Sequence, residues 1–490
     1  MDTRPKSSLG RTGLRLALPI ILMFVWPAKA GADPLLLGGE TGAMGGAGVA
    51  SGSDAGMFLL NPAGLARVSS LRVSFSGSLY ALSRVNVDKF FNDKRPATTA
   101  LGVTVLDDLE LSSTKIIAVP SVVSVLLGLG PKAGQTGHMV LGGSVVMPEN
   151  RSYFFEGEAN ATAAYVGKHS NLYAHESSQI YFGPTFGIQL GQRLFLGASL
   201  YAVYQPFRNA INSTYVLADE QGSNYVSIDS RADSQGRSFE LLGVAGVQLQ
   251  ATEGLSFGLA ISTPSVHLGG SFDGLGETKA FGSAALTTSV RSSRSQGEAT
   301  RKIPMRITAG LSYRRAKRFG VSADFSALLP TDGARRVETD DAMLTLQPSA
   351  APQRSSTHTV TGWNSQFAFQ INVGGELYVR ESWVLRAGFF MDRPLHESFA
   401  DPLTGVDVLE LRLAHFGGTL GVSTVQGAVQ STFGVAVSYG SGTTGALTFA
   451  DIKPRETDVK SLDVIFFITG GFDFSELKRS LGKYLNRGIK

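Results

Sequence analysis

The stretch FGVSADFSALL, residues 319–329, alternates between apolar side chains and small or polar ones. One set of positions carries Phe319, Val321, Ala323, Phe325, Ala327 and Leu329, and the other carries Gly320, Ser322, Asp324 and Ser326. Because successive side chains of a β-strand point to opposite faces, this alternation predicts a strand with one apolar and one polar face. Residues 71–80, 432–439 and 462–474 repeat the pattern.

Composition indicates what surrounds such strands. The chain has 490 residues, no cysteine, 58 glycines and only 17% charged residues, whereas soluble domains average about 25% charged residues and about 7% glycine. Without cysteine, neither a disulfide nor a thiolate metal site can form. No stretch beyond residue 32 offers 18 consecutive apolar residues, so we expect no transmembrane helix. A secreted chain of this kind has one well-known membrane solution, a closed β-barrel in an outer membrane.

Residues 1–32 have the features of a signal peptide, because basic residues precede the apolar run 16–26 and small residues follow it. The apolar run is too short to span a bilayer as a helix, which takes roughly 20 residues. The whole chain holds 44 Lys and Arg and 40 Asp and Glu; residues 1–30 hold five basic residues and one acidic residue, which leaves 39 of each. The basic excess thus belongs to the leader, and we expect no nucleic-acid partner.

Alternation fits about fourteen strands between residues 69 and 474. The sequence therefore predicts an all-β fold, a transmembrane antiparallel β-barrel of about 14 strands, followed by a C-terminal periplasmic tail at 475–490. An even-stranded barrel with both termini in the periplasm has short turns at that end and long loops outside. We expect the short turns at 191–192, 252–253, 314–317 and 380–382, and the long outer loops at 85–112, 149–176, 207–235, 271–301, 331–360 and 394–408.

The glycine-rich segment GAMGGAGVASGSDAGMFLLNPAGLA, residues 42–66, precedes the first predicted strand. Its portion 46–51 nearly matches a dinucleotide-binding loop, but that loop requires a strand before it and a helix after it. Neither is predicted here, so a compact segment that suits a lumen too narrow for large side chains is the better interpretation. Asn61 stands before a proline, where asparagine disfavours helix and caps turns.

Residues 37–66 resemble the N-terminal plug of the FadL family of outer-membrane transporters for long-chain fatty acids and other hydrophobic compounds, which includes the TodX-type aromatic hydrocarbon channels. The likeness lies in the small-residue run 42–50, in Asp54-Ala55-Gly56 and in Asn61-Pro62-Ala63. WVLRAGFFMDRPL, residues 383–395, is also similar to a strand of that family. The resemblance implies that residues 33–68 form an N-terminal hatch plugging the lumen, with Asp54, Asn61, Pro62 and Ala63 as hatch residues.

The resemblance further implies that a ligand enters from the outer loops, shifts the hatch and leaves sideways beside a kinked third strand. The third predicted strand here, TGHMVLGGSVVMP at 136–148, contains Gly142 and Gly143 and ends at Pro148. Both residue types weaken a β-ladder and favour a bulge or kink. We therefore predict that the lateral opening lies beside Gly142, Gly143 and Pro148.

Four charged residues stand out on the polar faces of the predicted strands: Arg72, Arg306, Arg386 and Glu376. Charges inside a barrel are normally paired or hydrated, so an internal ion-pair network is one interpretation. In the other, one or two of the arginines bind an anionic head group through bidentate hydrogen bonds.

These features predict an outer-membrane channel for passive uptake of hydrophobic small molecules, either long-chain fatty acids or aromatic hydrocarbons. We expect a monomer in contact with outer-membrane lipid and no cofactor. Because no HExxH or GxSxG pattern occurs, we also expect no metal and no enzymatic activity. The alternatives are a FadL-like barrel that acts as a protein-docking or secretion-assembly scaffold, an open porin, and a barrel-wall hydrolase.

Overall fold

The computed structural model describes residues 37–88, 103–105, 111–163, 165–219, 225–282, 289–348, 350–395, 411–426, 428–446 and 455–474. The predicted signal peptide (1–32) and the predicted tail (475–490) lie outside the described residues. The sequence interpretation of those two segments therefore stays a prediction.

Fourteen antiparallel wall strands form a closed barrel, which confirms the predicted fold class. Closure comes from β1, which pairs with β19 on one side and with β3 on the other. A three-residue strand, β2 (Val103–Val105), pairs with β4. Ten wall strands are continuous: β1 (Arg72–Val87), β3 (Leu111–Leu129), β4 (Met139–Ala163), β5 (Tyr165–Leu190), β6 (Leu194–Asp219), β7 (Tyr225–Gln250), β16 (Trp383–Asp392), β17 (Arg412–Gln426), β18 (Val429–Ala446) and β19 (Arg455–Asp473).

The other four wall strands are each divided into a lower and an upper piece. The pairs are β8 (Leu255–Ser262) with β9 (Val266–Gly282), β11 (Arg306–Arg315) with β10 (Ser289–Arg301), β12 (Phe319–Leu328) with β13 (Thr331–Gln347), and β15 (Ala368–Arg380) with β14 (Ala350–Ser365). Pro264, Pro304 and Pro330 lie in three of the breaks, where a missing N–H ends the ladder. The breaks lie at one level, because Ser265 N donates to Ile303 O and Leu329 N to Met305 O, both at 2.9 Å.

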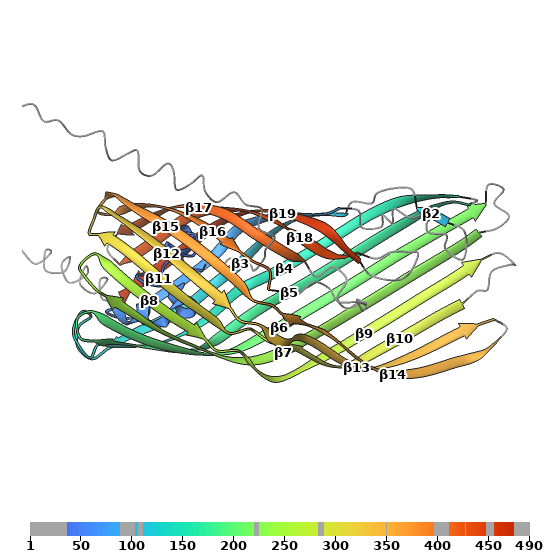
Figure 1. Ribbon diagram of the computed structural model, residues 1–490, viewed down its shortest axis with the longest axis horizontal. Coiled ribbons are helices and arrows are strands. Elements are labelled where there is room, and N and C mark those ends of the chain that lie inside the picture. The colour runs from blue at the N-terminus through green and yellow to red at the C-terminus, as the bar shows by residue number, and fades with distance from the viewer. Residues whose placement is uncertain are drawn as a thin grey trace, which may run out of the picture.

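Four of the stretches predicted to be outer loops are instead continuations of strands. Residues 149–176 lie mostly in β4 and β5, 207–235 in β6 and β7, 271–301 in β9 and β10, and 331–360 in β13 and β14. Figure 1 shows these strands running on past the compact end of the barrel. Alternation of apolar and polar residues is weaker there, because polar side chains occur on both faces of these extensions. The predicted loops 85–112 and 394–408 lie largely outside the described residues, and the four predicted short turns are confirmed.

The wall is apolar outside and polar inside. On β12, Phe319, Val321 and Phe325 are exposed, whereas Ser322 and Asp324 between them are buried. This reverses the arrangement of a soluble protein and is typical of a barrel whose outer face contacts lipid. No helix among the described residues is long and apolar enough to span a membrane.

Candidate functional site

Residues 37–68, here called the hatch segment, lie inside the barrel. The segment contains three short helical turns: α1 (Glu40–Ala43), α2 (Met57–Leu60) and the 3₁₀ turn η2 (Pro62–Arg67). Its backbone hydrogen-bonds to strands on different sides of the closed wall: β6, β7, β12 and β17. Figure 1 shows it in blue, within the compact end of the barrel.

Asn61 ties two parts of the hatch segment to the wall. Its amide nitrogen donates to Val49 O at 2.7 Å and to Val247 O of β7 at 3.1 Å. Its carbonyl oxygen accepts from Ala63 N at 3.2 Å and caps η2, whose first residue is Pro62. Since Asn61 is fully buried, each of these bonds replaces one to water that the site does not allow.

Backbone groups of the hatch segment also bind side chains of the wall. Asp324 of β12 accepts from Gly48 N at 2.6 Å and from Val49 N at 2.9 Å. Glycine permits the close approach: a Cβ at Gly388 of β16 would overlap the backbone of Gly45. Gly45 has a φ of 69°, in the left-handed region that favours glycine. The glycine-rich composition of the segment thus serves close backbone packing.

Asp54 closes the hatch segment on itself. Its carboxylate accepts from Glu40 N at 2.8 Å and from Thr41 N and Thr41 Oγ1, both at 3.1 Å. Burial, reinforced by the Glu40 carboxylate, raises the pKa of Asp54 from 3.8 to about 6. Burial also works to raise the pKa of Glu40, but the guanidinium groups of Arg386 and Arg314 outweigh it and lower that pKa below 4.5.

Docking of the hatch segment is therefore expected to tighten as the pH falls from about 7 to 5. The raised pKa of Asp54 means that the docked state binds a proton more tightly than the undocked state, so docking gains stability below pH 6. We expect solute leak at pH 5 to be roughly tenfold lower than at pH 7.5. Below about pH 4.5 the gain is opposed, because protonation of Glu40 weakens its ion pairs. Conductance of single barrels in a planar bilayer measures the leak.

The matched variant for this pH dependence is Asp54→Asn, which keeps the acceptor oxygen but does not titrate. Its leak is expected to stay nearly constant between pH 7.5 and 5. A wild-type leak that rises steadily over this range, or an Asp54→Asn barrel with the wild-type profile, would contradict the assignment.

An ion-pair network joins the hatch segment to the wall. Arg386 Nη2 lies 3.2 Å from Glu40 Oε1 and 3.2 Å from Glu376 Oε2, and Arg314 Nε lies 2.6 Å from Glu376 Oε1. The Arg386 and Glu376 side chains are almost entirely buried. Of the four charged residues singled out in the sequence, the structure thus brings Arg386 and Glu376 together, and it gives them ion-pair partners.

The other two charged candidates lie elsewhere. Arg72 of β1 forms a looser pair with Asp473, with Nη2 3.9 Å from Oδ2. Arg306 begins β11 at the level of the strand breaks and lines an inner cavity. Arg306 therefore borders a cavity, whereas Arg72 is held in an ion pair at the start of β1.

One side of the lumen is apolar. Met57, Phe58 and Leu65 of the hatch segment form a buried cluster with wall residues of β3–β7, which include Val122, Leu126, Val140, Val146, Tyr181, Tyr201, Val203, Leu242 and Val244. The ion pairs described above lie on other strands, β11, β15 and β16. We call the β3–β7 side, where the hatch segment makes most of its apolar contacts, the apolar side.

The ladder between β3 and β4 is interrupted on the apolar side. Register pairs run from Leu129↔Met139 to Val122↔Val146 and resume at Ser112↔Glu156, with none between them along the described lengths of these two strands. The β4–β5 register also shifts between Val146 and Glu149, around Pro148. We call this interruption, β3 residues 113–121 facing β4 residues 147–155, the seam.

The three residues predicted to flank a lateral opening fall on both sides of the seam's lower edge. Gly142 and Gly143 pair with β3 and with β5, so they lie in the continuous part of the ladder. Pro148 lies within the seam. Side chains still cross it, because Lys115 Nζ donates to Ser152 Oγ and Phe154 N donates to Ser113 Oγ.

Two inner cavities adjoin at the seam. One, of about 150 Å³, lies above the hatch segment between Leu59, Tyr181, Leu242 and Arg306. The other, of about 210 Å³, extends from Leu37 and Phe467 to Met147. Pro148, Glu149 and Arg151 line both cavities. Both cavities thus reach residues of the seam.

Several wall residues that hold the hatch segment were not singled out from the sequence. Tyr201 Oη donates to Phe58 O at 2.7 Å, Gln248 Nε2 to Val49 O at 3.1 Å and Thr419 Oγ1 to Ala43 O at 2.8 Å. Their only local signal is a polar or hydroxyl group on the inward face of a strand. No group of three or more His, Asp and Glu side chains among the described residues is arranged to hold a metal ion.

The barrel matches solved structures of outer-membrane channels over nearly its whole length. A FadL homologue from Pseudomonas aeruginosa aligns with a TM-score of 0.55 at 12% identity, covering 91% of this chain and 100% of that one. The toluene transporter TodX from P. putida aligns with a TM-score of 0.53 at 12% identity, covering 90% and 99%. The fold is that of the FadL-type channels.

A third FadL-type structure, the monoaromatic hydrocarbon channel CymD, aligns with a TM-score of 0.50 at 16% identity, covering 90% of this chain and 99% of that one. No protein-family model matches the sequence, and neither does any curated protein. The FadL-type fold, which the residues at 37–66 and 383–395 had indicated, is therefore confirmed by the arrangement of the strands.

Proposed function

We propose that this chain is an outer-membrane channel for passive uptake of hydrophobic small molecules, in which the hatch segment moves and the ligand leaves sideways through the seam. The observation that carries the proposal is the pair of cavities, one of them above the hatch segment, that both reach the interrupted β3–β4 ladder on the apolar side. FadL-type structures that are named as hydrocarbon channels and transporters support it.

Sideways release suits a hydrophobic ligand. Such a molecule gains roughly 0.8 kcal/mol for each CH₂ that it removes from water. A route that ends in lipid keeps this gain, whereas a hydrated pore loses it. No covalent step or cofactor is needed for such diffusion.

The 150 Å³ cavity above the hatch segment, here called the upper cavity, is lined by charged residues that favour a ligand with an acidic end, such as a long-chain fatty acid. Arg306, Arg301 and Arg335 line it, together with Lys302 and Arg151, and Glu149 is its acidic residue. A carboxylate accepts bidentate hydrogen bonds from guanidinium groups, while Leu59, Tyr181 and Leu242 offer apolar contact. A neutral aromatic hydrocarbon would use the apolar contacts alone.

Uptake by cells with and without the gene tests the proposal. Deletion is expected to slow the uptake of labelled long-chain fatty acid. Returning the gene as the Arg306→Gln variant is expected to restore toluene uptake fully and fatty-acid uptake only in part. If deletion changes uptake of neither compound, the channel proposal is wrong. If Arg306→Gln restores uptake of both compounds equally, the proposal of an acidic ligand is wrong.

Closing the seam is expected to reduce uptake about tenfold or more. The chain contains no cysteine, so Lys115→Cys with Ser152→Cys, whose side chains touch across the seam, can be bridged by a short bis-maleimide. The control pair is Val125→Cys with Gly143→Cys, register partners in the intact ladder. The control bridge is expected to leave uptake unchanged. Equal uptake by both bridged barrels would show that the ligand does not leave through the seam.

A docking scaffold is the second candidate, because one edge of β14 is open among the described strands. The register of β14 is formed with β13, and none is formed with another described strand. An exposed strand edge accepts a strand from a partner protein. Deleting the β13–β14 hairpin, residues 331–365, separates the two functions: it is expected to leave uptake intact if the hairpin only docks a partner.

A further inference from the structure

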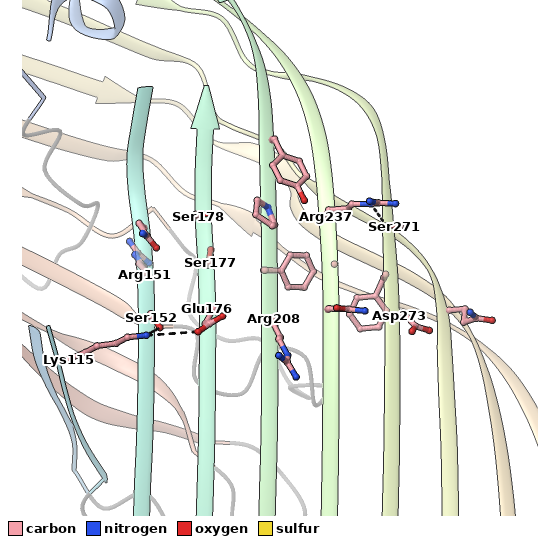
Figure 2. A pocket seen from close by; sticks show the side chains of 18 residues that line it. Lys115, Arg151, Ser152, Glu176, Ser177, Ser178, Arg208, Arg237, Ser271 and Asp273 are labelled. Atoms are coloured by element: carbon pink, nitrogen blue, oxygen red, sulfur yellow. Dashed lines mark hydrogen bonds and ion pairs between the residues drawn. The ribbon is translucent and has the colours of Figure 1, made fainter. Parts of the chain in front are cut away.

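The outer face of the wall carries a concavity of about 830 Å³ that begins at the seam and extends away from it across the neighbouring strands. It crosses β3, β4, β5, β6, β7, β9 and β10 above the level of the strand breaks. Figure 2 shows its side chains on these neighbouring strands. Along β6, Tyr204, Pro206 and Arg208 face it, while the buried Gln205 and Asn209 point to the lumen.

The concavity begins where the apolar outer band ends. Leu200 of β6 and Phe239 of β7 are exposed below it, and the Tyr204 ring lies 5.0 Å from the Phe239 ring, centroid to centroid. From Leu194 to Tyr204, β6 has about the 9–11 residues with which a tilted strand crosses a bilayer. Aromatic rings mark the boundary of the hydrocarbon in such barrels. The residues above Tyr204 therefore lie at the height of lipid headgroups.

Cations at that height have hydrogen-bonding capacity left. Arg237 makes one hydrogen bond among the described residues, from Nε to Ser271 Oγ at 3.0 Å, although a guanidinium has five donors. Arg208 pairs with Asp233 at 2.7 Å, and Lys115 lies 4.0 Å from Glu176 (Figure 2). Exposed pairs of this kind are weak and exchange readily for another anion.

The remaining lining is suited to sugars. It includes aromatic rings, on which a sugar can stack, and hydroxyl and amide groups that donate and accept hydrogen bonds: Ser152, Ser178, Ser271, Asn150, Gln235 and Gln296. Two carboxylates also line the concavity, and each has a basic partner: Glu176 lies 4.0 Å from Lys115, and Asp273 lies 3.7 Å from Arg294. Bidentate guanidinium contacts favour phosphate over a neutral headgroup.

We propose that this concavity binds the phosphorylated sugar headgroup of an anionic glycolipid in the outer leaflet. Arg208 and Arg237 contact the phosphate, the hydroxyl and amide groups contact the sugar, and the acyl chains lie along the apolar band below Tyr204. The inference rests on the membrane placement given under the proposed function, and not on transport.

Native mass spectrometry of the full-length barrel in detergent tests the proposal, with a bisphosphorylated disaccharide lipid as the probe. Wild-type barrel is expected to retain it, and Arg208→Gln with Arg237→Gln to lose affinity about tenfold or more. The matched control is Arg231→Gln with Arg354→Gln, which removes the same charge from exposed positions outside the concavity. It is expected to bind within about twofold of wild type. Resistance of the folded barrel to unfolding in SDS verifies that each variant is intact.

Three results would overturn the proposal: equal binding by the wild type and the Arg208/Arg237 variant, equal binding of the dephosphorylated lipid, and full competition by inorganic phosphate at equal concentration, which would identify a free-phosphate site instead. Fatty-acid uptake is measured on the same variants and is expected to be unchanged. Loss of lipid binding with normal uptake thus separates this site from the channel. If the barrel binds the lipid but transports nothing, only the channel proposal is refuted.

Discussion

Asn61→Ala is expected to raise the leak of small solutes through the barrel about 30-fold or more. The substitution removes the donor to Val49 O and Val247 O and the acceptor for Ala63 N. Each buried group left without a partner costs about 1–3 kcal/mol. Gln248 still donates to Val49 O, so the cost falls mainly on the other two groups. A loss of about 2–3 kcal/mol in the free energy of docking raises the population of undocked barrels about 30-fold or more.

Conductance in planar bilayers and the sensitivity of cells to a bulky antibiotic both report this leak. Asn364→Ala is the control, because Asn364 also accepts one backbone hydrogen bond, from Gly333 N, but at an exposed position of β14. Its leak is expected to equal that of wild type. If Asn61→Ala changes neither the leak nor the uptake, Asn61 does not hold the hatch segment, and Asn61-Pro62-Ala63 is only a sequence feature of the fold.

Arg386→Met is expected to destabilise docking of the hatch segment by about 3–5 kcal/mol, the usual cost of removing one partner from a buried ion pair. Methionine leaves the Glu40 and Glu376 carboxylates without the cation that lies 3.2 Å from each. Arg314 still neutralises Glu376 at 2.6 Å. The uncompensated charge therefore falls mainly on Glu40, which belongs to the hatch segment. We expect a large, permanently raised conductance.

A second variant distinguishes an undocked hatch segment from a barrel that fails to assemble. Glu40→Gln removes the charge that Arg386→Met leaves unpaired, so Arg386→Met with Glu40→Gln is expected to recover part of the lost docking. Lys317→Met is the matched control, because Lys317 and Glu381 form a 2.7 Å pair that is largely exposed, and such pairs contribute about 0–1 kcal/mol. If the double variant leaks as much as Arg386→Met, the Glu40 contact does not hold the hatch segment.

The candidate site was only partly predictable. The resemblance indicates Asp54 and Asn61 as hatch residues, but it does not indicate their hydrogen-bond partners. Asn61 bonds to Val247, 186 residues away, and Asp324 to Gly48, 276 residues away. No local pattern encodes such distances, because they follow from the register of every strand in between. Glycine and proline indicate a lateral opening beside Gly142, Gly143 and Pro148, whereas the extent of the seam depends on where β3 and β4 part.

The sequence by itself determined the wall of this protein. A strand between lipid and lumen must alternate, as Phe319, Val321 and Phe325 do with Ser322 and Asp324, and each such strand can be recognised separately. Above the apolar band both faces meet water, so alternation ends, and only the paired structure shows that β4–β7 continue to 25 or 26 residues each. Tertiary structure alone decided which polar groups hold the hatch segment, where the cavities meet the seam and how the outer concavity forms. Each of these depends on side chains from strands that closure of the barrel brings together.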